Sequence, residues 1–363
     1  MFELIEPEVI IKVAVIGIGG CGCNTIDSIY PAIESSSVTL FTMNTDKVVL
    51  EHGASHEKLL MGSTLTQGFG AGADPEIGKK AAEESMSDIT NMLEPFDIII
   101  CATGLGGGTG TGASPVIAEI INKELDKPCI FIATSPFESE GPLRNKIAME
   151  GLESLKSKAN AVINLPNDKL IKVLGEDIGL FDAFRHSNQI LQSLIRSLLD
   201  MLSNHGLINV DLKDFANVMN NQGDAILGVG KADTEDELTN AVNTAINNPL
   251  VEAVDLTNSS GAIIQISCSQ EISIGSYNKV ISQVREKLPA TALVICGVSM
   301  IENLSTPFEI LVIATGINQC QSFNVNVEQT YETDEHEEDK QNDKIHPDDL
   351  FSIPAYLRQR KDD

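Results

Sequence analysis

The sequence contains no tryptophan, and aromatic residues make up only 4% of its 363 residues. Basic residues are also scarce, since 25 Lys and Arg stand against 52 Asp and Glu, for a net charge of −27. So acidic a chain repels phosphate backbones and anionic lipid, so we expect no nucleic-acid binding and no direct membrane insertion. No apolar stretch reaches the length of a membrane span, and the first residues lack a basic, cleavable signal, which predicts a cytoplasmic protein.

The seven cysteines do not form an obvious framework. Their number is odd and they are scattered, which favours reduced thiols over disulfides. Cys21 and Cys23 have the spacing of a metal-binding pair, but no second pair or histidine cluster accompanies them. We therefore expect no metal site made from protein side chains alone.

Glycine, by contrast, is concentrated in one central stretch. An apolar strand predicted over 97–103 runs into the loop Gly104–Gly112, and a helix follows from Ala113 with Pro115 expected in its first turn. Glycine backbone N–H groups and the positive end of a helix together bind phosphate oxygens. The loop contains no lysine, so it is not a Walker-type loop.

Two further loops of small residues also lead into predicted helices. The predicted strand Ile11–Ile18 leads into Gly19–Asn24 and then a helix over 25–33, while the loop Gly68–Pro75 leads into a helix over 76–93. Strands and helices keep alternating, which predicts a parallel sheet with its ligand at the carboxyl ends of the strands. The remaining elements expected in this half are a strand over 38–43, a strand over 128–134, a helix over 143–158 and a strand over 161–165.

A dinucleotide-binding dehydrogenase is the rival interpretation. Gly17, Gly19 and Gly22 satisfy its glycine fingerprint, and Asp46 after the next strand could bind a ribose. This interpretation leaves the loop Gly104–Gly112 without a role.

The second half begins with a helix predicted over 181–204 and ended by Gly206. An α+β unit follows, with strands near 225–232, 262–268, 292–299 and 309–315 and helices near 235–247 and 276–288. The fold class we expect is α/β: a Rossmann-like nucleotide-binding domain (1–180), a long central helix (181–204) and a second α+β domain (205–318).

The C-terminal residues change in character twice. Residues 319–347 are polar and acidic, which predicts a disordered linker. Residues 348–363 are predicted to be a docking peptide that becomes ordered when it binds a partner. The alternative is a stray apolar terminus without a binding role. The apolar residues of this segment are Leu350, Ile353, Pro354, Tyr356 and Leu357.

The stretch Gly106–Gly112, read Gly-Gly-Gly-Thr-Gly-Thr-Gly, resembles the signature of the tubulin/FtsZ family of GTPases. The resemblance runs over nearly the whole chain and includes Asn44-Thr45-Asp46, the stretches 165–170 and 206–211, and the tail 353–358. It implies GTP or GDP with Mg²⁺ as ligands, head-to-tail self-assembly into filaments, and a scaffold role in the cytokinetic ring at midcell. It also implies that membrane adaptors such as FtsA or ZipA bind the C-terminal peptide.

The resemblance also implies roles for individual residues. Asn209, Asp211 and Asp214 match the loop that enters a neighbouring subunit's site for catalysis, although Asp211 could instead simply cap the next helix. The expected GTP-binding residues are Gly20, Cys21, Gly22, Cys23, Asn24, Gly70, Ala71, Gly72, Gly106, Gly107, Gly108, Thr109, Gly110, Glu140, Arg144, Asn167, Phe184, Asn188 and Gln189.

Several positions depart from the family pattern. Cys21 and Cys23 replace glycines, Asp74 replaces an asparagine, and Gln189 stands where an aspartate generally reads guanine. A glutamine offers one acceptor and one donor group, whereas an aspartate accepts from both guanine N–H groups, so we expect a weaker guanine preference. The alternative function is thus a divergent nucleotide-binding co-filament or regulator with weak GTPase activity. A plasmid-segregating relative is disfavoured by the docking peptide.

Overall fold

The computed structural model describes residues 11–30, 37–55, 57–169, 175, 178–203, 207–220, 224–247, 256–301, 304 and 306–317. The predicted linker and docking peptide lie outside these residues, as does Gly206. The described residues all belong to one compact unit.

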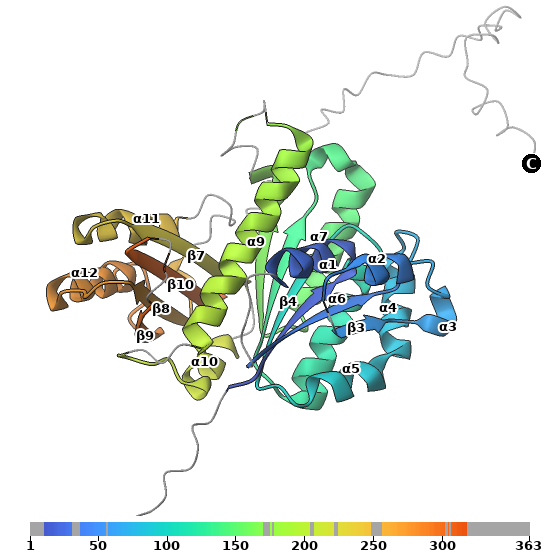
Figure 1. The fold of residues 1–363 in the computed structure, drawn as a ribbon, viewed down its shortest axis with the longest axis horizontal. Helices are drawn as coiled ribbons and strands as arrows, with labels where there is room; N and C mark the ends of the chain where they lie inside the picture. Colours follow the sequence, from blue (N-terminus) through green and yellow to red (C-terminus); the bar gives the residue numbers. More distant parts are fainter. Residues whose placement is uncertain are drawn as a thin grey trace, which may run out of the picture. The chain divides into compact units, whose positions relative to one another are not determined.

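A ten-stranded sheet with the order β3-β2-β1-β4-β5-β6-β7-β10-β8-β9 runs through this unit (Figure 1). Its first six strands are parallel, as the alternating pattern predicted for five of them, whereas β3 was not predicted. The central strands are buried along almost their whole length because helices cover both faces. These strands are β1 (Val13–Ile18), β2 (Val38–Asn44), β3 (Glu57–Leu60), β4 (Ile98–Gly104), β5 (Cys129–Ser135) and β6 (Ala161–Pro166).

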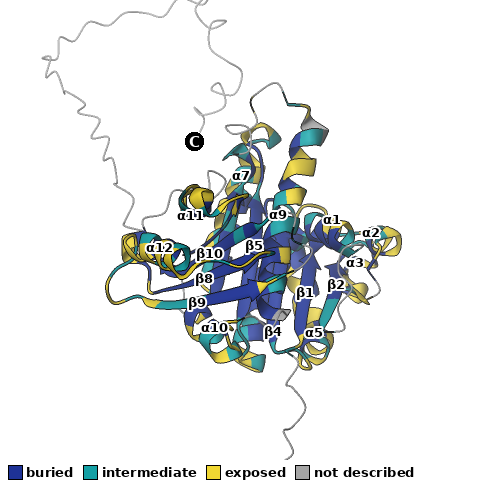
Figure 2. Ribbon diagram, turned by 60° about the vertical axis from the view of Figure 1, so that its left-hand side comes forward, coloured by how far each residue is buried: buried dark blue, intermediate teal, exposed yellow. Residues whose placement is uncertain are grey.

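Two apolar clusters bury the faces of this parallel half, and Figure 2 shows the buried strands enclosed by helices with exposed outer faces. The helices are α1 (Gly19–Ile29), α2 (Lys47–His52), α3 (Ser63–Thr66), α4 (Pro75–Glu84), α5 (Met86–Leu93), α6 (Thr109–Glu119), the π-helix Ile120–Leu125, the 3₁₀ turn Glu138–Glu140 and α7 (Pro142–Lys156).

Three of the predicted helix boundaries were wrong. Helix α1 begins at Gly19 and α6 at Thr109, inside the segments expected to be loops, so Pro115 lies in the helix interior instead of its first turn. Glycine is the reason, because a first turn without side chains can lie directly against the strand before it: a Cβ on Gly110 would be 2.3 Å from the Gly104 carbonyl oxygen. The single helix predicted over 76–93 is divided at Ser85, whose φ of −95° and ψ of 13° are not helical.

The second half contains α9 (Leu180–Ser203), which runs beside the sheet in Figure 1. β10 is antiparallel to β7 and β8, while β8 and β9 are parallel, and α11 and α12 cover one face of these strands. The elements are α10 (Leu212–Met219), β7 (Asp224–Ala232), the 3₁₀ turn Glu235–Glu237, α11 (Leu238–Ile246), the 3₁₀ turn Leu256–Asn258, β8 (Gly261–Cys268), α12 (Ile274–Arg285), β9 (Leu293–Met300) and β10 (Phe308–Ile317).

The two halves share the sheet, because β6 and β7 pair in parallel at Val162 and Asp224. Lys156, the last residue of α7, adds a half-buried ion pair to Asp224 at 2.5 Å. In the part of the chain that the structure describes, no helix is long and apolar enough to cross a membrane.

Candidate nucleotide site

A cavity of about 370 Å³ lies at the carboxyl ends of the parallel strands, where the sequence predicted the ligand. It is lined by Gly20, Cys21, Asn24, Gly104, Leu105, Gly107, Gly108, Thr109, Gly110, Thr134, Pro136, Glu140, Arg144, Asn167, Phe184, Ser187 and Asn188. These residues come from the first turns of α1, α6, α7 and α9, from the ends of β4 and β5, from the segments that follow β4, β5 and β6, and from the 3₁₀ turn before α7.

The central glycine loop is held by its own backbone and by α6. Gly106 has a φ of 92°, which only glycine adopts without strain, and its N–H donates to Thr111 Oγ1 at 2.9 Å. Thr109 Oγ1 lies 2.7 Å from Thr45 Oγ1, so the first residue of α6 is also tied to the end of β2. The N–H groups at the start of α6 have no partner within the helix, and this end of the helix attracts anions.

The two cysteines of the first loop have different positions. Cys21 lines the cavity, with its Sγ 3.5 Å from Thr134 Oγ1, whereas Cys23 is buried behind it and receives a hydrogen bond from Asn44 Nδ2 at 3.8 Å. Burial raises the pKa of the Cys21 thiol, and it raises the pKa of the Cys23 thiol to about 12. Both are therefore neutral thiols at pH 7, and no group of three or more metal-ligating side chains occurs among the described residues.

One ion pair, Glu140 with Arg144, supplies the only charged side chains among the described residues of the cavity lining. Glu140 Oε1 accepts from the Phe137 N–H at 2.9 Å, and its Oε2 lies 3.1 Å from Arg144 Nη1. The carboxylate is mostly buried, whereas the guanidinium is half exposed. Arg144 can thus meet a phosphate or sugar oxygen while Glu140 holds it in place.

The first turns of α9 present an aromatic ring and an amide to the cavity. The Phe184 ring is 39% exposed and contacts the buried Phe137 ring edge to face, at 5.2 Å between centroids. Asn188, one turn along, and Asn167, just after β6, also line the cavity. A flat ring beside amide groups suits a stacked nucleobase.

Of the predicted GTP-binding residues, twelve line this cavity and seven do not. Those outside the lining are Gly22, Cys23, Gly70, Ala71, Gly72, Gly106 and Gln189. Gln189 instead lines a second cavity of about 410 Å³, between α9 and the strands β7 and β10. Gly22 supports the site from behind, because a Cβ there would be 2.4 Å from the Ala102 carbonyl oxygen.

Sequence reasoning missed Ser187 among the lining residues. Phe184, Ser187 and Asn188 have the i, i+3, i+4 spacing of one helix face, so the helical pattern could have identified it. Gly104, Leu105, Thr134 and Pro136 were also missed as lining residues; they stand where β4 and β5 end, which parallel-sheet topology marks as the ligand edge.

The acidic residues near the other glycine loops are used as helix caps. Asp46 accepts from the Val48 N–H at 2.9 Å and begins α2, and Asp74 accepts from the Glu76 N–H at 2.9 Å and begins α4. Neither lines the cavity. The ribose-binding role that a dehydrogenase would need from Asp46 therefore has no support in this arrangement.

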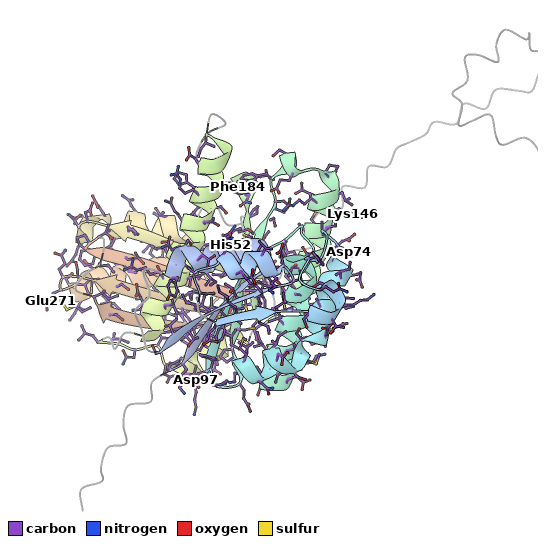
Figure 3. The ribbon with its side chains drawn as sticks, turned by 45° about the vertical axis from the view of Figure 1, so that its right-hand side comes forward. His52, Asp74, Asp97, Lys146, Phe184 and Glu271 are labelled. Atoms are coloured by element: carbon purple, nitrogen blue, oxygen red, sulfur yellow. The ribbon has the colours of Figure 1, made fainter. Side chains whose placement is uncertain are left out.

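The predicted catalytic residues lie at the opposite end of α9. Asn209 and Asp211 are exposed and line a separate cavity of about 310 Å³ that also includes Asp97 and Leu202. In Figure 3, Asp97 and Phe184 lie at opposite ends of the body. The 24 residues of α9 span about 36 Å, so these side chains are far from the cavity of their own chain.

Asp211 also has the structural role that was considered for it. Its Oδ1 accepts from the Asp214 N–H at 2.7 Å and caps α10. Three residues earlier, Ile208 pairs with Val298 of β9 through two backbone hydrogen bonds, of 3.3 and 2.9 Å, which holds the loop in place. The carboxylate's second oxygen is left to face solvent or a partner.

Comparison with known proteins agrees with this geometry. The family model described as "Tubulin/FtsZ family, GTPase domain" matches residues 12–175, and "FtsZ family, C-terminal domain" matches residues 223–318. "Cell division protein FtsZ 1" of Thermococcus kodakarensis is 38% identical over 320 residues, which are 88% of this chain and 84% of that protein. "Cell division protein FtsZ" of Wigglesworthia glossinidia brevipalpis is 34% identical with both chains covered completely.

Among solved structures, "FtsZ dimer, empty (M. jannaschii)" matches with a TM-score of 0.79 and 35% identity, covering 86% of this chain and 90% of the other. The overall fold of this chain thus recurs in a solved structure of similar sequence. The chain therefore belongs to the tubulin/FtsZ family of GTPases and carries the C-terminal domain of the FtsZ branch.

Proposed function

We propose that this chain forms head-to-tail filaments in cell division and hydrolyses GTP at a site shared by two copies. The observation that carries this is the separation along α9: the glycine-loop cavity lies at one end and the exposed side chains of Asn209 and Asp211 at the other. A single copy holds both halves of a hydrolytic site but cannot bring them together. Stacking copies in one direction would place the loop of one copy over the cavity of the next.

Each half has a distinct task in this proposal. The backbone N–H groups of the glycine loop and α6 bind the phosphates, Phe184 stacks on the base, and Arg144 pairs with phosphate or sugar oxygens. The side chains of Asn209, Asp211 and Asp214 from the next copy orient the water that attacks the γ-phosphate. The cavity's own lining offers no free carboxylate for this task among the residues that the structure describes.

The same arrangement indicates how Mg²⁺ would be held. Glu140, the one carboxylate among the described lining residues, is paired with Arg144, so the metal would be bound mainly through phosphate oxygens and water. Bound there, it would neutralise charge on the β- and γ-phosphates. Chelation with EDTA is expected to abolish hydrolysis, and undiminished turnover in EDTA would exclude this role.

Exposed apolar side chains next to both halves support an interface. Phe69 is 86% exposed in the loop before α4, and its neighbour Gly70 hydrogen-bonds to Thr45, which contacts Thr109 of the cavity. Leu207 is 81% exposed beside the catalytic loop. Burying such side chains between copies would stabilise the filament by about 2 kcal/mol each.

The test is the dependence of hydrolysis on protein concentration. Specific activity should rise steeply with concentration, while dilute protein binds GTP and turns it over poorly. Gly107→Asp should block phosphate binding by charge without a steric clash, because nothing lies within 4 Å of a Cβ at this position. Neither Gly107→Asp nor Asp211→Ala should hydrolyse GTP alone, and mixing them should restore part of the activity. Activity independent of concentration, or no recovery on mixing, would count against a shared site.

The C-terminal peptide completes the proposal, although its residues lie outside those that the structure describes. Its apolar residues around Ile353 and Tyr356 follow an acidic stretch, which suits capture by adaptor proteins such as FtsA or ZipA and recruitment to the division site at midcell. Deleting residues 348–363 should leave hydrolysis unchanged and abolish binding to the adaptor in a pull-down. Retained binding would exclude the peptide as the docking site.

A further inference from the structure

The loop that carries Asn209 and Asp211 is attached to the second half of the sheet by one buried side chain, Val210. Of the five residues 207–211, only Val210 is buried, with 6% of its surface exposed, and it belongs to a large apolar cluster. Asp211 has an extended backbone, and successive side chains of an extended chain point to opposite sides. The position of Val210 therefore sets the direction in which Asn209 and Asp211 point.

Val210 packs against β9 at Gly297, a residue without a side chain. A Cβ on Gly297 would be 2.9 Å from Val210 Cγ2 and 2.0 Å from Gln265 Oε1, and both distances are too short for a real contact. Gly297 lies inside a strand and has no positive φ, so the close approach of its neighbours, and not its own backbone conformation, requires glycine here.

The Gln265 side chain closes the other side of this space. Gln265 is opposite Gly297 in the parallel pairing of β8 and β9, and it is 2% exposed. Its amide is held by a hydrogen bond of 2.8 Å to Ser299 Oγ. Val210 is branched at Cβ and has few alternative rotamers. A methyl group on Gly297 would therefore push Val210, and the loop with it, away from β9.

Fixed points on both sides keep such a shift local. Ile208 is paired with Val298 through two backbone hydrogen bonds, and Asp211 caps α10 at the Asp214 N–H. The strand pairing and the helix are thus retained while the segment between them moves, and the Asp211 carboxylate moves with Val210. A misplacement of about 1 Å can lower the rate of an enzymatic reaction about a hundredfold.

We propose that Gly297 is a positioning residue for hydrolysis: it leaves the space that Val210 occupies, so that Asn209 and Asp211 point toward the nucleotide of the next copy. The inference rests on the proposed shared site and adds to it what holds the second half in place. Gly297 does not line the nucleotide cavity, so its replacement should affect hydrolysis and not nucleotide binding.

The test is Gly297→Ala, with Gly275→Ala as the matched control. The control adds the same methyl group to a glycine of α12, where nothing lies within 4 Å of a Cβ. Gly297→Ala should bind GDP with the affinity of wild type in titration calorimetry. At saturating protein concentration it should release phosphate about tenfold more slowly, or slower still. Gly275→Ala should match wild type in both measurements, and a wild-type rate in Gly297→Ala would overturn the proposal.

A mixing experiment distinguishes a misplaced loop from a general folding defect. Gly297→Ala keeps its nucleotide cavity, so mixing it with Gly107→Asp, whose loop is intact, should restore activity as far as mixing Asp211→Ala with Gly107→Asp does. Mixing Gly297→Ala with Asp211→Ala should restore none, because neither variant has a working loop. No recovery with Gly107→Asp, where Asp211→Ala recovers, would overturn the positioning role.

Val210→Ala is a second variant, which removes the anchoring side chain without adding an atom to the space. It should also bind GDP normally, hydrolyse GTP slowly and recover only with Gly107→Asp. Full hydrolysis by Val210→Ala would overturn the proposal, and this outcome would decide the question even if Gly297→Ala did not fold. If Asp211→Ala and Gly107→Asp did not recover with each other, the proposed shared site itself would fail.

Discussion

The two ends of α9 carry the two halves of the proposed site, and they are built in different ways. At the nucleotide end, the loop that would bind the phosphates is mostly glycine backbone, fixed by close contacts between α6, α4 and the strands. At the other end, the loop before α10 presents the exposed side chains of Asn209 and Asp211. In the proposed mechanism, the first half is complete within one chain, whereas the second half needs the nucleotide of another copy. The proposal therefore assigns nucleotide binding to the single chain and hydrolysis to the assembly.

The largest expected effect, on the rate of GTP hydrolysis, comes from removing the charge of Asp211, in the loop before α10. Asp211→Asn should lower the hydrolysis rate by roughly 10² to 10⁴, because the carboxylate that orients water is lost. Thermal stability should not change, since asparagine caps a helix about as well as aspartate and can still accept from the Asp214 N–H. Phosphate release and melting curves together separate the two roles of Asp211.

The control is Asp74→Asn, the same chemical change at the cap of α4. Because Asp74 does not line the cavity, this variant should keep its hydrolysis rate. Full turnover in Asp211→Asn would show that capping is the whole role of Asp211.

An intermediate effect, on stability and on GDP binding, is expected from adding a side chain where the backbones of α6 and α4 are in close contact. A Cβ on Gly112 would be 1.9 Å from the Pro75 carbonyl oxygen, so Gly112→Ala must push α6 away from α4. We expect a loss of about 1–3 kcal/mol in the free energy of unfolding, and weaker GDP binding because the start of α6 moves. Differential scanning calorimetry and GDP titration measure the two effects.

Gly107→Ala is the matched control for this change. It adds the same methyl group to the same glycine-rich stretch, but no atom lies within 4 Å of the new Cβ. Its melting temperature should stay near that of wild type. An unchanged melting temperature in Gly112→Ala would mean that the contact between α6 and α4 is not tight in solution.

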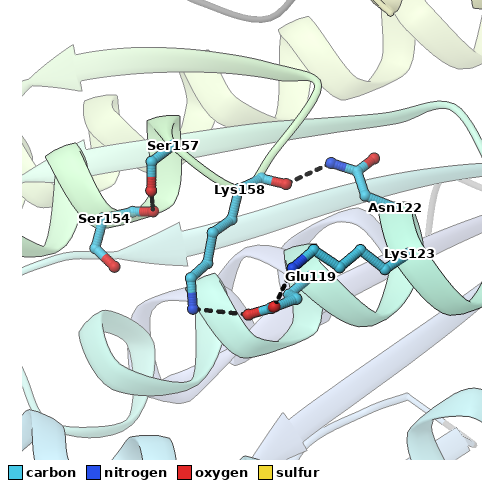
Figure 4. Close-up of polar contacts among 6 residues, drawn as sticks. All are labelled: Glu119, Asn122, Lys123, Ser154, Ser157 and Lys158. Atoms are coloured by element: carbon cyan, nitrogen blue, oxygen red, sulfur yellow. Dashed lines mark hydrogen bonds and ion pairs between the residues drawn. The ribbon is translucent and has the colours of Figure 1, made fainter.

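The smallest effect should come from the far end of α6. Glu119 lies 2.6 Å from Lys123 Nζ and 2.9 Å from Lys158 Nζ (Figure 4), and hydrogen bonds from Lys123 and Lys158 lower the pKa of Glu119 to about 2. Because this pKa lies below that of the unfolded chain, the ionised carboxylate stabilises the fold above about pH 4.5, and the contribution is lost as the pH falls toward 2. Glu119→Gln should destabilise the protein by less than about 1 kcal/mol at pH 7, since the pairs are partly exposed.

The corresponding measurement is the melting temperature of Glu119→Gln and wild type as a function of pH. The difference should be constant between pH 7 and about 4.5 and shrink below that. Glu150→Gln removes an exposed helical pair with Lys146, at 3.8 Å, and should show no comparable difference. A difference for Glu119→Gln that grows toward low pH would contradict the assigned sign.

Much of the fold could be predicted from the chain because its signals are local. Buried strands read as uninterrupted apolar runs, and the glycine loops identified the ligand edge of the sheet. Ser85 was missed as a break because serine is compatible with a helix interior; its hydroxyl instead accepts from the Gly62 N–H at 3.0 Å, a contact 23 residues distant in sequence. The early starts of α1 and α6 were missed because glycine lowers helix propensity.

The sequence by itself determined five of the six parallel strands, the positions of the glycine-rich segments and the length of α9, because apolar periodicity and glycine placement act over a few residues. Only the tertiary structure decided which side chains face the nucleotide cavity. Ser187 and Gln189 are two residues apart on one helix, yet the helical turn directs the first to the nucleotide cavity and the second to the cavity beside β7. The tertiary structure likewise placed Asp211 about one helix length from the nucleotide cavity of its own chain. The reason is that the cavity and Asp211 lie at opposite ends of α9.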